Sequence, residues 1–129
     1  MKIIIIDDDV FKREQITDFL EELKIEYKCF LYTNPALRYI LKNKENISGI
    51  ILDMGLQSYE DSHYYSLTKG MDIIIEKKKK RLYIPVLINS SRDVSMFDKP
   101  SFIFGQRTEI DNYQILEDYI CFLKQREKQ

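Results

Sequence analysis

Five short apolar segments divide the chain, and longer segments of mixed polarity separate most of them. We read these segments as β-strands at residues 2–6, 27–32, 49–53, 84–89 and 101–104. The first, KIIII, is apolar at every position after its lysine. Continuous β-branched runs of this kind are typical of strands that are buried on both faces of a parallel sheet.

Helical periodicity appears after the first and second of these strands. In residues 10–24, apolar side chains recur on one helix face at Ile16, Phe19, Leu20 and Leu23. The segment TNPALRYILKN, residues 33–43, predicts a second helix with Asn34 as its N-cap and Pro35 as its first helical residue.

Two further helices follow the third and fifth strands. GMDIIIEKKKKR begins at residue 70, and its inward side chains are expected to be Met71, Ile74 and Ile75. Its lysine run, residues 77–80, is expected to be a solvated helix end, because cations are favourable near a helix C-terminus. The buried stripe of the last helix is predicted to be Leu116, Tyr119, Ile120 and Leu123.

This alternation predicts an α/β domain with a doubly wound, five-stranded parallel sheet and helices on both faces. A chain of 129 residues has the size of one ordinary domain, so residues 1–129 are taken as a single unit. The segment SSRDVSMFDKP is too broken for a full helix, so the fourth helix of such a fold is expected to be short or absent. The connection 54–69 is long for an α/β unit.

Acidic side chains lie where two of the predicted strands end. Asp7, Asp8 and Asp9 follow the first strand, and Asp53 closes the third. Carboxylates this close repel one another, so they either spread into water as a turn or converge on a cation. If the two strands are neighbours, the acids meet at the carboxyl edge of the sheet, where ligands bind in such folds. Carboxylate oxygens suit Mg²⁺, so a magnesium site is the more specific prediction.

Composition narrows the functional classes. The chain has 21 acidic and 20 basic residues, a balance that argues against a general nucleic-acid binder. No apolar run approaches the roughly 20 residues needed to cross a bilayer, and the N-terminus does not resemble a signal peptide. We therefore expect a cytoplasmic protein without direct nucleic-acid or membrane contacts.

Three motifs together resemble the receiver domain of bacterial response regulators, the CheY-like family, in a divergent form. IIIIDDD is similar to that family's first strand and acidic pair, which map onto Asp7 and Asp8. IILDMGL is similar to the third strand with its phospho-acceptor, which falls on Asp53, and the residue that gives a backbone carbonyl to the metal is then Gly55. IPVLINSS is similar to the fourth strand, whose terminal hydroxyl residue maps onto Ser90.

The resemblance implies a sheet of strand order 2-1-3-4-5 and a switch aromatic at Phe102. It implies that Asp53 accepts a phosphoryl group with Mg²⁺ and that Ser90 hydrogen-bonds that group. The implied partners are a sensor histidine kinase or phosphotransfer protein and a downstream protein. The domain would act as a stand-alone signalling module, as a monomer or a weak homodimer.

Two departures from the family pattern matter for function. Receivers carry a lysine at the end of the fifth strand, and the aligned position here is Gly105, followed by Gln106 where a proline is usual. The candidates to replace that cation from another direction are Arg92 and Arg107. The connection 54–69 is longer than in the family and contains the only histidine, His63, which we expect to be solvated rather than functional.

Three functions remain open from the sequence. The first is a phospho-accepting receiver. The second is a degenerate receiver that serves as a protein-interaction module without phosphorylation, which the missing lysine favours. The third, ranked last, is a Mg²⁺-dependent enzyme such as a phosphatase, because acidic clusters at strand ends also serve that chemistry.

Overall fold

The computed structural model describes residues 1–57, 65–66, 70–94 and 100–128. The strands are β1 (Lys2–Ile6), β2 (Glu26–Phe30), β3 (Gly49–Leu52), β4 (Leu56–Gln57), β5 (Tyr65–Ser66), β6 (Val86–Asn89) and β7 (Ile103–Arg107). The helices are α1 (Val10–Glu22), α2 (Thr33–Asn43), α3 (Met71–Lys79) and α4 (Gln114–Glu127), with a short 3₁₀ turn, η1 (Lys44–Asn46), after α2.

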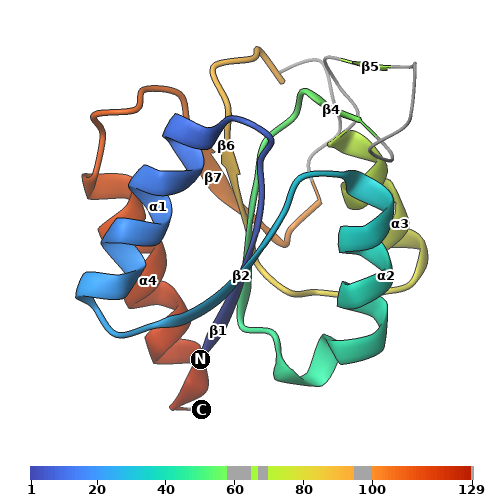
Figure 1. Cartoon of the computed structure of the whole chain (residues 1–129). Coiled ribbons are helices and arrows are strands. Elements are labelled where there is room, and N and C mark those ends of the chain that lie inside the picture. The colour runs from blue at the N-terminus through green and yellow to red at the C-terminus, as the bar shows by residue number, and fades with distance from the viewer. Residues whose placement is uncertain (58–64, 67–69, 95–99, 129) are drawn as a thin grey trace.

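The main sheet has five parallel strands in the order β2-β1-β3-β6-β7, which confirms the predicted order 2-1-3-4-5. In Figure 1, α1 and α4 cover one face of this sheet, and α2 and α3 cover the other. Among the described residues, no helix lies between β6 and β7, as the sequence indicated. None of the described helices is long and apolar enough to cross a bilayer.

The four isoleucines of β1 supply the cores on both faces. Ile3 and Ile5 pack with residues of α1 and α4, whereas Ile4 and Ile6 pack with residues of α2 and α3. Each is at most 1% exposed, because successive strand side chains point to opposite faces and both faces are covered. The stripe predicted for the last helix is also confirmed, since Leu116, Tyr119, Ile120 and Leu123 are all buried.

The start of α2 differs from the prediction. Its N-cap is Tyr32, not Asn34, and no side chain caps the helix. Pro35 is the third residue of the helix rather than the first. A proline is tolerated throughout the first turn, because those N–H groups have no partner within the helix, so its position does not locate the helix start.

The inner face of α3 also differs. Ile75 was expected to point inward but is 46% exposed, and Ile73 is buried instead. Lys77, expected at a solvated helix end, is fully buried. Its Nζ donates a 2.9 Å hydrogen bond to the carbonyl of Leu82, which follows the helix. Lys77 lies one helical turn after Ile73, so burial of this face takes the lysine with it.

The last strand of the sheet was predicted at residues 101–104 but spans Ile103–Arg107. Its last three residues, GQR, are not apolar, so the hydrophobic pattern did not indicate that the strand continues to Arg107. The register contains a bulge, because Val86 lies opposite Ile103 while Leu87 lies opposite Gly105. The intervening Phe104 therefore has no partner on β6, an arrangement that sequence alone does not reveal.

Part of the long connection after β3 forms a second, two-stranded antiparallel sheet of β4 and β5. His63 lies outside the described residues. Gly70 follows this connection and is the N-cap of α3. A Cβ on Gly70 would lie 2.4 Å from the backbone oxygen of Asp53, so only glycine lets α3 approach the end of β3 this closely.

Candidate functional site

The acidic residues meet at the carboxyl ends of two adjacent strands. β1 and β3 pair through Ile6 and Leu52, so the residues that follow them are neighbours. Asp53 N–H donates to the carbonyl of Ile6 at 2.9 Å. Oxygens of Asp7, Asp8 and Asp53 lie within 4.8 Å of one another. The expectation that these carboxylates meet at the carboxyl edge of the sheet is confirmed.

The three consecutive aspartates have different surroundings. Asp7 is 1% exposed and its Oδ1 accepts a 2.9 Å hydrogen bond from the N–H of Asp9. Asp8 is exposed at the mouth of the cluster. Asp9 is the N-cap of α1, and its Oδ1 accepts from the N–H of Lys12 at 3.1 Å. Two of the carboxylates thus belong to the cluster, and the third fixes the start of the helix that follows.

Lys12, which the sequence analysis did not single out, reaches into the cluster from the first turn of α1. Its Nζ donates to Asp53 Oδ1 at 3.1 Å and lies 3.4 Å from Asp7 Oδ2. Only 19% of its side chain is exposed. No spacing in the sequence indicated this contact, because Asp8 and Asp7 precede the N-cap Asp9 and lie outside the helix.

Burial and charge act in opposite directions on these groups. Burial raises the pKa of Asp7 to about 6, with a further upward contribution from Asp53, although Lys12 opposes it. Burial and the nearby Asp53 likewise raise the pKa of Asp8. Burial alone would lower the pKa of Lys12, but Asp7 and Asp53 outweigh it, and the net shift is upward. The cluster therefore favours the charged form of Lys12, whereas burial disfavours the ionised form of Asp7.

Ser90 follows β6 at the same edge of the sheet and is 5% exposed. Its Oγ accepts from the N–H of Arg92 at 3.2 Å, and its own N–H donates to the carbonyl of Arg107 at 3.1 Å. Gln106 secures the turn further, because its Nε2 donates to the carbonyls of Ser90 and Arg92, both at 2.7 Å. A small hollow of about 60 Å³ is lined by both Ser90 and Lys12.

The cation expected at the end of the last strand is not at Gly105. Gly105 lies within β7 and pairs with Leu87 of β6, and β7 ends two residues later at Arg107. The Arg107 guanidinium is 1% exposed and donates to Asn89 Oδ1, to the carbonyl of Asn112 at 3.0 Å and to the carbonyl of Ile110. These contacts hold the loop before α4, so Arg107 acts as a structural clamp.

The remaining predicted positions lie as follows. Gly55 is buried three residues after the end of β3. Phe102 is 6% exposed and directly precedes β7, and its carbonyl accepts from the N–H of Val86, the first residue of β6. It therefore lies toward the amino edge of the sheet, away from the ends of β1 and β3. Its ring packs on the buried lysine of α3, with Lys77 Nζ 4.5 Å from the ring centroid.

The donor set fits a hard divalent cation. Asp7 Oδ2 is buried and accepts no hydrogen bond within the described part of the chain. Asp53 is also buried, at 8% exposure, and Asp8 is open to solvent. Mg²⁺ prefers such oxygens and keeps part of its hydration shell, which an exposed ligand permits. These three carboxylates, with the Gly55 carbonyl as a proposed fourth ligand, are the residues that would hold the ion.

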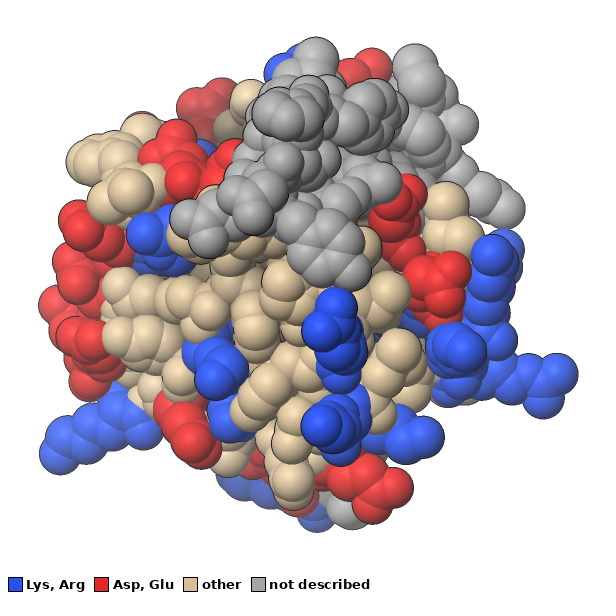
Figure 2. All heavy atoms as spheres, turned by 45° about the vertical axis from the view of Figure 1, so that its right-hand side comes forward, with Lys and Arg blue, Asp and Glu red and all other residues tan. Residues whose placement is uncertain are grey.

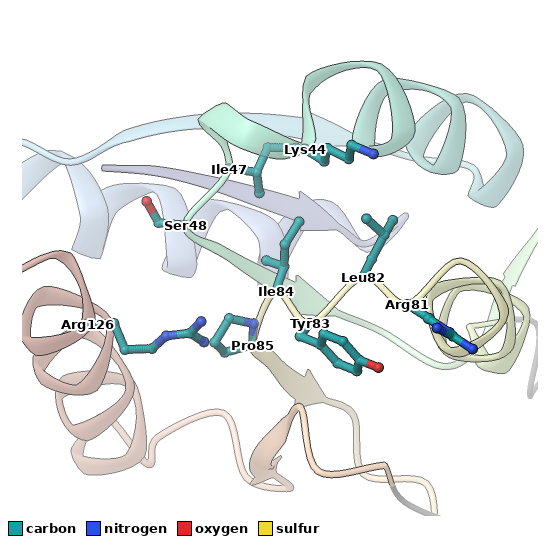
Figure 3. Close-up of a pocket in the computed structure, with 9 residues that line it drawn as sticks. All are labelled: Lys44, Ile47, Ser48, Arg81, Leu82, Tyr83, Ile84, Pro85 and Arg126. Atoms are coloured by element: carbon teal, nitrogen blue, oxygen red, sulfur yellow. The ribbon is translucent and has the colours of Figure 1, made fainter. Parts of the chain in front are cut away.

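A larger hollow, of about 400 Å³, lies at the opposite, amino edge of the sheet. Figure 3 shows it beside Ile84 and Pro85, which precede β6, with Lys44 on one side and Arg126 on the other. Lysine and arginine side chains also gather over the lower part of the face in Figure 2. None of the unpaired buried polar atoms in the described residues belongs to the lining of this hollow. The candidate site therefore rests on chemistry at the carboxyl edge rather than on the size of a hollow.

Solved structures of receiver domains resemble this chain over nearly its whole length. A response regulator receiver domain protein from Clostridium thermocellum is 25% identical, with a TM-score of 0.76, 98% of this chain covered and 96% of that one. The receiver domain of a LuxO repressor protein from Vibrio parahaemolyticus is 13% identical, with a TM-score of 0.74 and coverages of 98% and 92%. The histidine kinase ThkA in complex with response regulator TrrA, a structure from Thermotoga maritima, gives 20% identity, a TM-score of 0.69 and coverages of 95% and 97%. No family model and no curated protein matches the sequence.

Proposed function

Since the chain has the fold of a CheY-like response regulator receiver domain, we propose that it accepts a phosphoryl group on Asp53 with Mg²⁺ in two-component signalling. The observation that carries the proposal is the gathering of Asp7, Asp8 and Asp53 within 4.8 Å at the carboxyl ends of β1 and β3. Receiver domains are signalling phospho-acceptors rather than enzymes, so the Mg²⁺-dependent phosphatase reading loses its support.

Each residue has a distinct part in this function. An oxygen of Asp53 forms the new P–O bond while the P–N bond of a phosphohistidine breaks and the imidazole leaves. Bound Mg²⁺ would neutralise charge on the transferred group. Asp7 and Asp8, with Asp53, would hold the ion. The Ser90 hydroxyl, which its turn orients at the same edge, would donate to a phosphoryl oxygen. Catalysis is then mainly positioning and charge neutralisation.

The proposed partners are a sensor histidine kinase or phosphotransfer protein and a downstream protein. The support for a kinase is the Thermotoga maritima complex, in which a protein with the same fold was solved with a histidine kinase. A second structure of that regulator contains Mg²⁺ and BeF, and it is 18% identical to this chain with a TM-score of 0.65.

Intact-mass measurement after incubation with acetyl phosphate and MgCl₂ tests the proposal. We expect the wild-type protein to gain one phosphoryl group, and we expect Asp53→Asn to gain none, because the amide is a poor nucleophile of the same shape. The matched control is Asp18→Asn, which removes an exposed carboxylate of α1 and should leave phosphorylation unchanged. The proposal is wrong if Asp53→Asn still gains a phosphoryl group. It is also wrong if wild type gains none with Mg²⁺ present, when the mass is measured before an acyl phosphate could hydrolyse.

One observation favours the alternative, a phosphorylation-independent interaction module. Lys12 already offsets part of the negative charge of the acidic cluster without a metal, because its ammonium contacts Asp7 and Asp53 together. Under this alternative, wild type gains no phosphoryl group, and its complex with a partner is equally stable in Asp53→Asn. Pull-down with the wild-type and Asp53→Asn proteins, each with and without acetyl phosphate, separates the two functions.

A further inference from the structure

We propose that Lys12 is a tethered counter-cation that occupies the acidic cluster in the metal-free protein and that Mg²⁺ must displace. Its Nζ lies 3.1 Å from Asp53 Oδ1 and 3.4 Å from Asp7 Oδ2, the two buried carboxylates that would bind the ion. The proposal rests on the proposed magnesium site and adds to it a control of metal affinity by a residue of the chain itself.

The backbone holds Lys12 in position for this role. The Asp9 carboxylate caps α1 and accepts from the N–H of Lys12 at 3.1 Å. Asp9 also donates its N–H to Asp7 Oδ1 at 2.9 Å. Asp7 and the first turn of α1 are thus connected through one residue, and the lysine side chain has only a short distance to cover. Its side chain is four-fifths buried, so the ammonium is held within the cluster rather than free on the surface.

Two further cations of the described residues, Arg13 and Arg107, have other partners. Arg13 Nη1 donates to the backbone oxygen of Asp7, not to its carboxylate. The guanidinium of Arg107 is bound to the carbonyls of Ile110 and Asn112 and to Asn89. Among the described residues, the ion pairs of both buried carboxylates are with Lys12. Within the described part of the chain, removing this one ammonium therefore leaves both buried carboxylates without an ion-pair partner.

Competition follows from the shared oxygens. A divalent ion between Asp7 and Asp53 needs the same carboxylate atoms that Lys12 contacts. The ion and the ammonium would also repel each other strongly at such short range, because little water is present to screen them. The ammonium has somewhere to go, because the adjoining hollow of about 60 Å³ is lined by Lys12 itself and by Ser90 and Glu109. Oxygens of Ser90 and Glu109 offer new hydrogen-bond partners to the displaced ammonium. Ser90 is also the residue whose hydroxyl the proposed function assigns to the phosphoryl group.

Calorimetric titration with MgCl₂ tests the competition in wild type, Lys12→Met, Lys12→Arg and Lys124→Met. We expect Lys12→Met to bind Mg²⁺ about tenfold more tightly, a factor that corresponds to ~1.4 kcal/mol. Lys12→Arg retains a cation and should stay within a few-fold of wild type. Lys124→Met makes the same charge change on the exposed side of α4 and should leave the affinity unchanged. Equal or weaker binding by Lys12→Met would overturn the proposal.

Reductive methylation followed by peptide mass spectrometry tests whether Mg²⁺ moves the Lys12 ammonium out of the cluster. A change in the net charge of the protein alone would not produce this movement. Without Mg²⁺, Lys12 of the wild-type protein should react several-fold more slowly than Lys124. Saturating Mg²⁺ should raise the reactivity of Lys12 and leave that of Lys124 unchanged. Continued protection of Lys12 at saturating Mg²⁺ would contradict displacement, whatever the titration gives.

The outcomes separate this proposal from the proposed function. If wild type is phosphorylated on Asp53 but Lys12→Met binds Mg²⁺ no better, only the role of Lys12 is wrong. If Lys12→Met binds Mg²⁺ tightly and Lys12 becomes reactive with Mg²⁺, while no phosphoryl group is transferred, only the signalling function is wrong. Near-wild-type circular dichroism of Lys12→Met establishes that the variant is folded in these measurements.

Discussion

Lys12 and Lys77 are both largely removed from solvent, but their surroundings are opposite in kind. Lys12 enters a cluster of carboxylates at the carboxyl edge of the sheet, where Asp7 and Asp53 raise its pKa despite burial. Lys77 is buried beneath α3 against an aromatic ring and a carbonyl, and burial lowers its pKa to about 7. Burial alone therefore does not determine whether a lysine stays charged, because the neighbouring groups decide the sign of the shift.

The two sites also differ in what removal of the lysine would leave behind. Loss of the Lys12 ammonium leaves two buried carboxylates facing each other. Loss of the Lys77 ammonium leaves one carbonyl, that of Leu82, and an apolar surface that includes Phe102. The same substitution, lysine to methionine, should consequently have opposite effects on stability at the two positions.

The largest effect is expected at the acidic cluster. Lys12→Met should lower the free energy of unfolding of the metal-free protein by about 2–3 kcal/mol, because breaking a buried ion pair leaves uncompensated charge. That figure is below the range for fully buried pairs because Lys12 is 19% exposed. Urea denaturation with EDTA measures it, and saturating MgCl₂ should recover most of the loss. An unchanged midpoint in EDTA would show that the ion pair does not stabilise the fold.

The opposite sign is expected at the apolar site. Lys77→Met should raise the free energy of unfolding at neutral pH by about 1–2 kcal/mol, because an apolar side chain of similar length avoids the cost of burying an ammonium. Urea denaturation of the two proteins at pH 6 and pH 7 gives the difference. A destabilised Lys77→Met would mean that its hydrogen bond to Leu82 and its contact with Phe102 outweigh desolvation.

A pH series sharpens that prediction. The pKa of Lys77 is about 7 in the folded protein and 10.5 in its ordinary environment, so between these values the unfolded state binds more protons. Stability of the wild type should therefore rise with pH from about 7 to about 10.5, relative to Lys77→Met. The advantage of the variant is largest below pH 7 and shrinks as pH rises. A difference that stays constant across this window would show that Lys77 does not titrate there.

Much of the framework could be predicted from sequence, because it depends on local patterns. The isoleucines of residues 3–6 indicated a strand covered on both faces, and the aspartates at the ends of β1 and β3 indicated that their carboxylates meet. Both predictions are confirmed. They needed only the period of a strand and the rule that parallel strands end at one edge.

The two lysines were missed for different reasons. Lys12 and Asp53 are 41 residues apart, so their contact depends on how α1 is placed over the sheet, and no local pattern indicates it. Lys77 lay in a run of four lysines whose charge suggested solvent, although helical period places it on the same face as Ile73 and Ile74. There the periodicity was the better guide than the charge. The ends of β7 were missed because a bulge and the polar residues GQR carry no strand pattern.

The smallest effect is expected at a third lysine, which serves as the exposed reference for the other two. Lys79 is on the same helix as Lys77, and its Nζ lies 3.6 Å from Glu76 Oε1, with 68% of its side chain exposed. An exposed pair of this kind is screened by water and salt, so Lys79→Met should change the free energy of unfolding by no more than about 0.5 kcal/mol. Urea denaturation at low and high salt measures it beside the other two variants. If Lys79→Met changed the free energy of unfolding as much as Lys77→Met does, the effect at Lys77 would come from the charge on α3 and not from burial. The comparison of the two buried lysines would then fail.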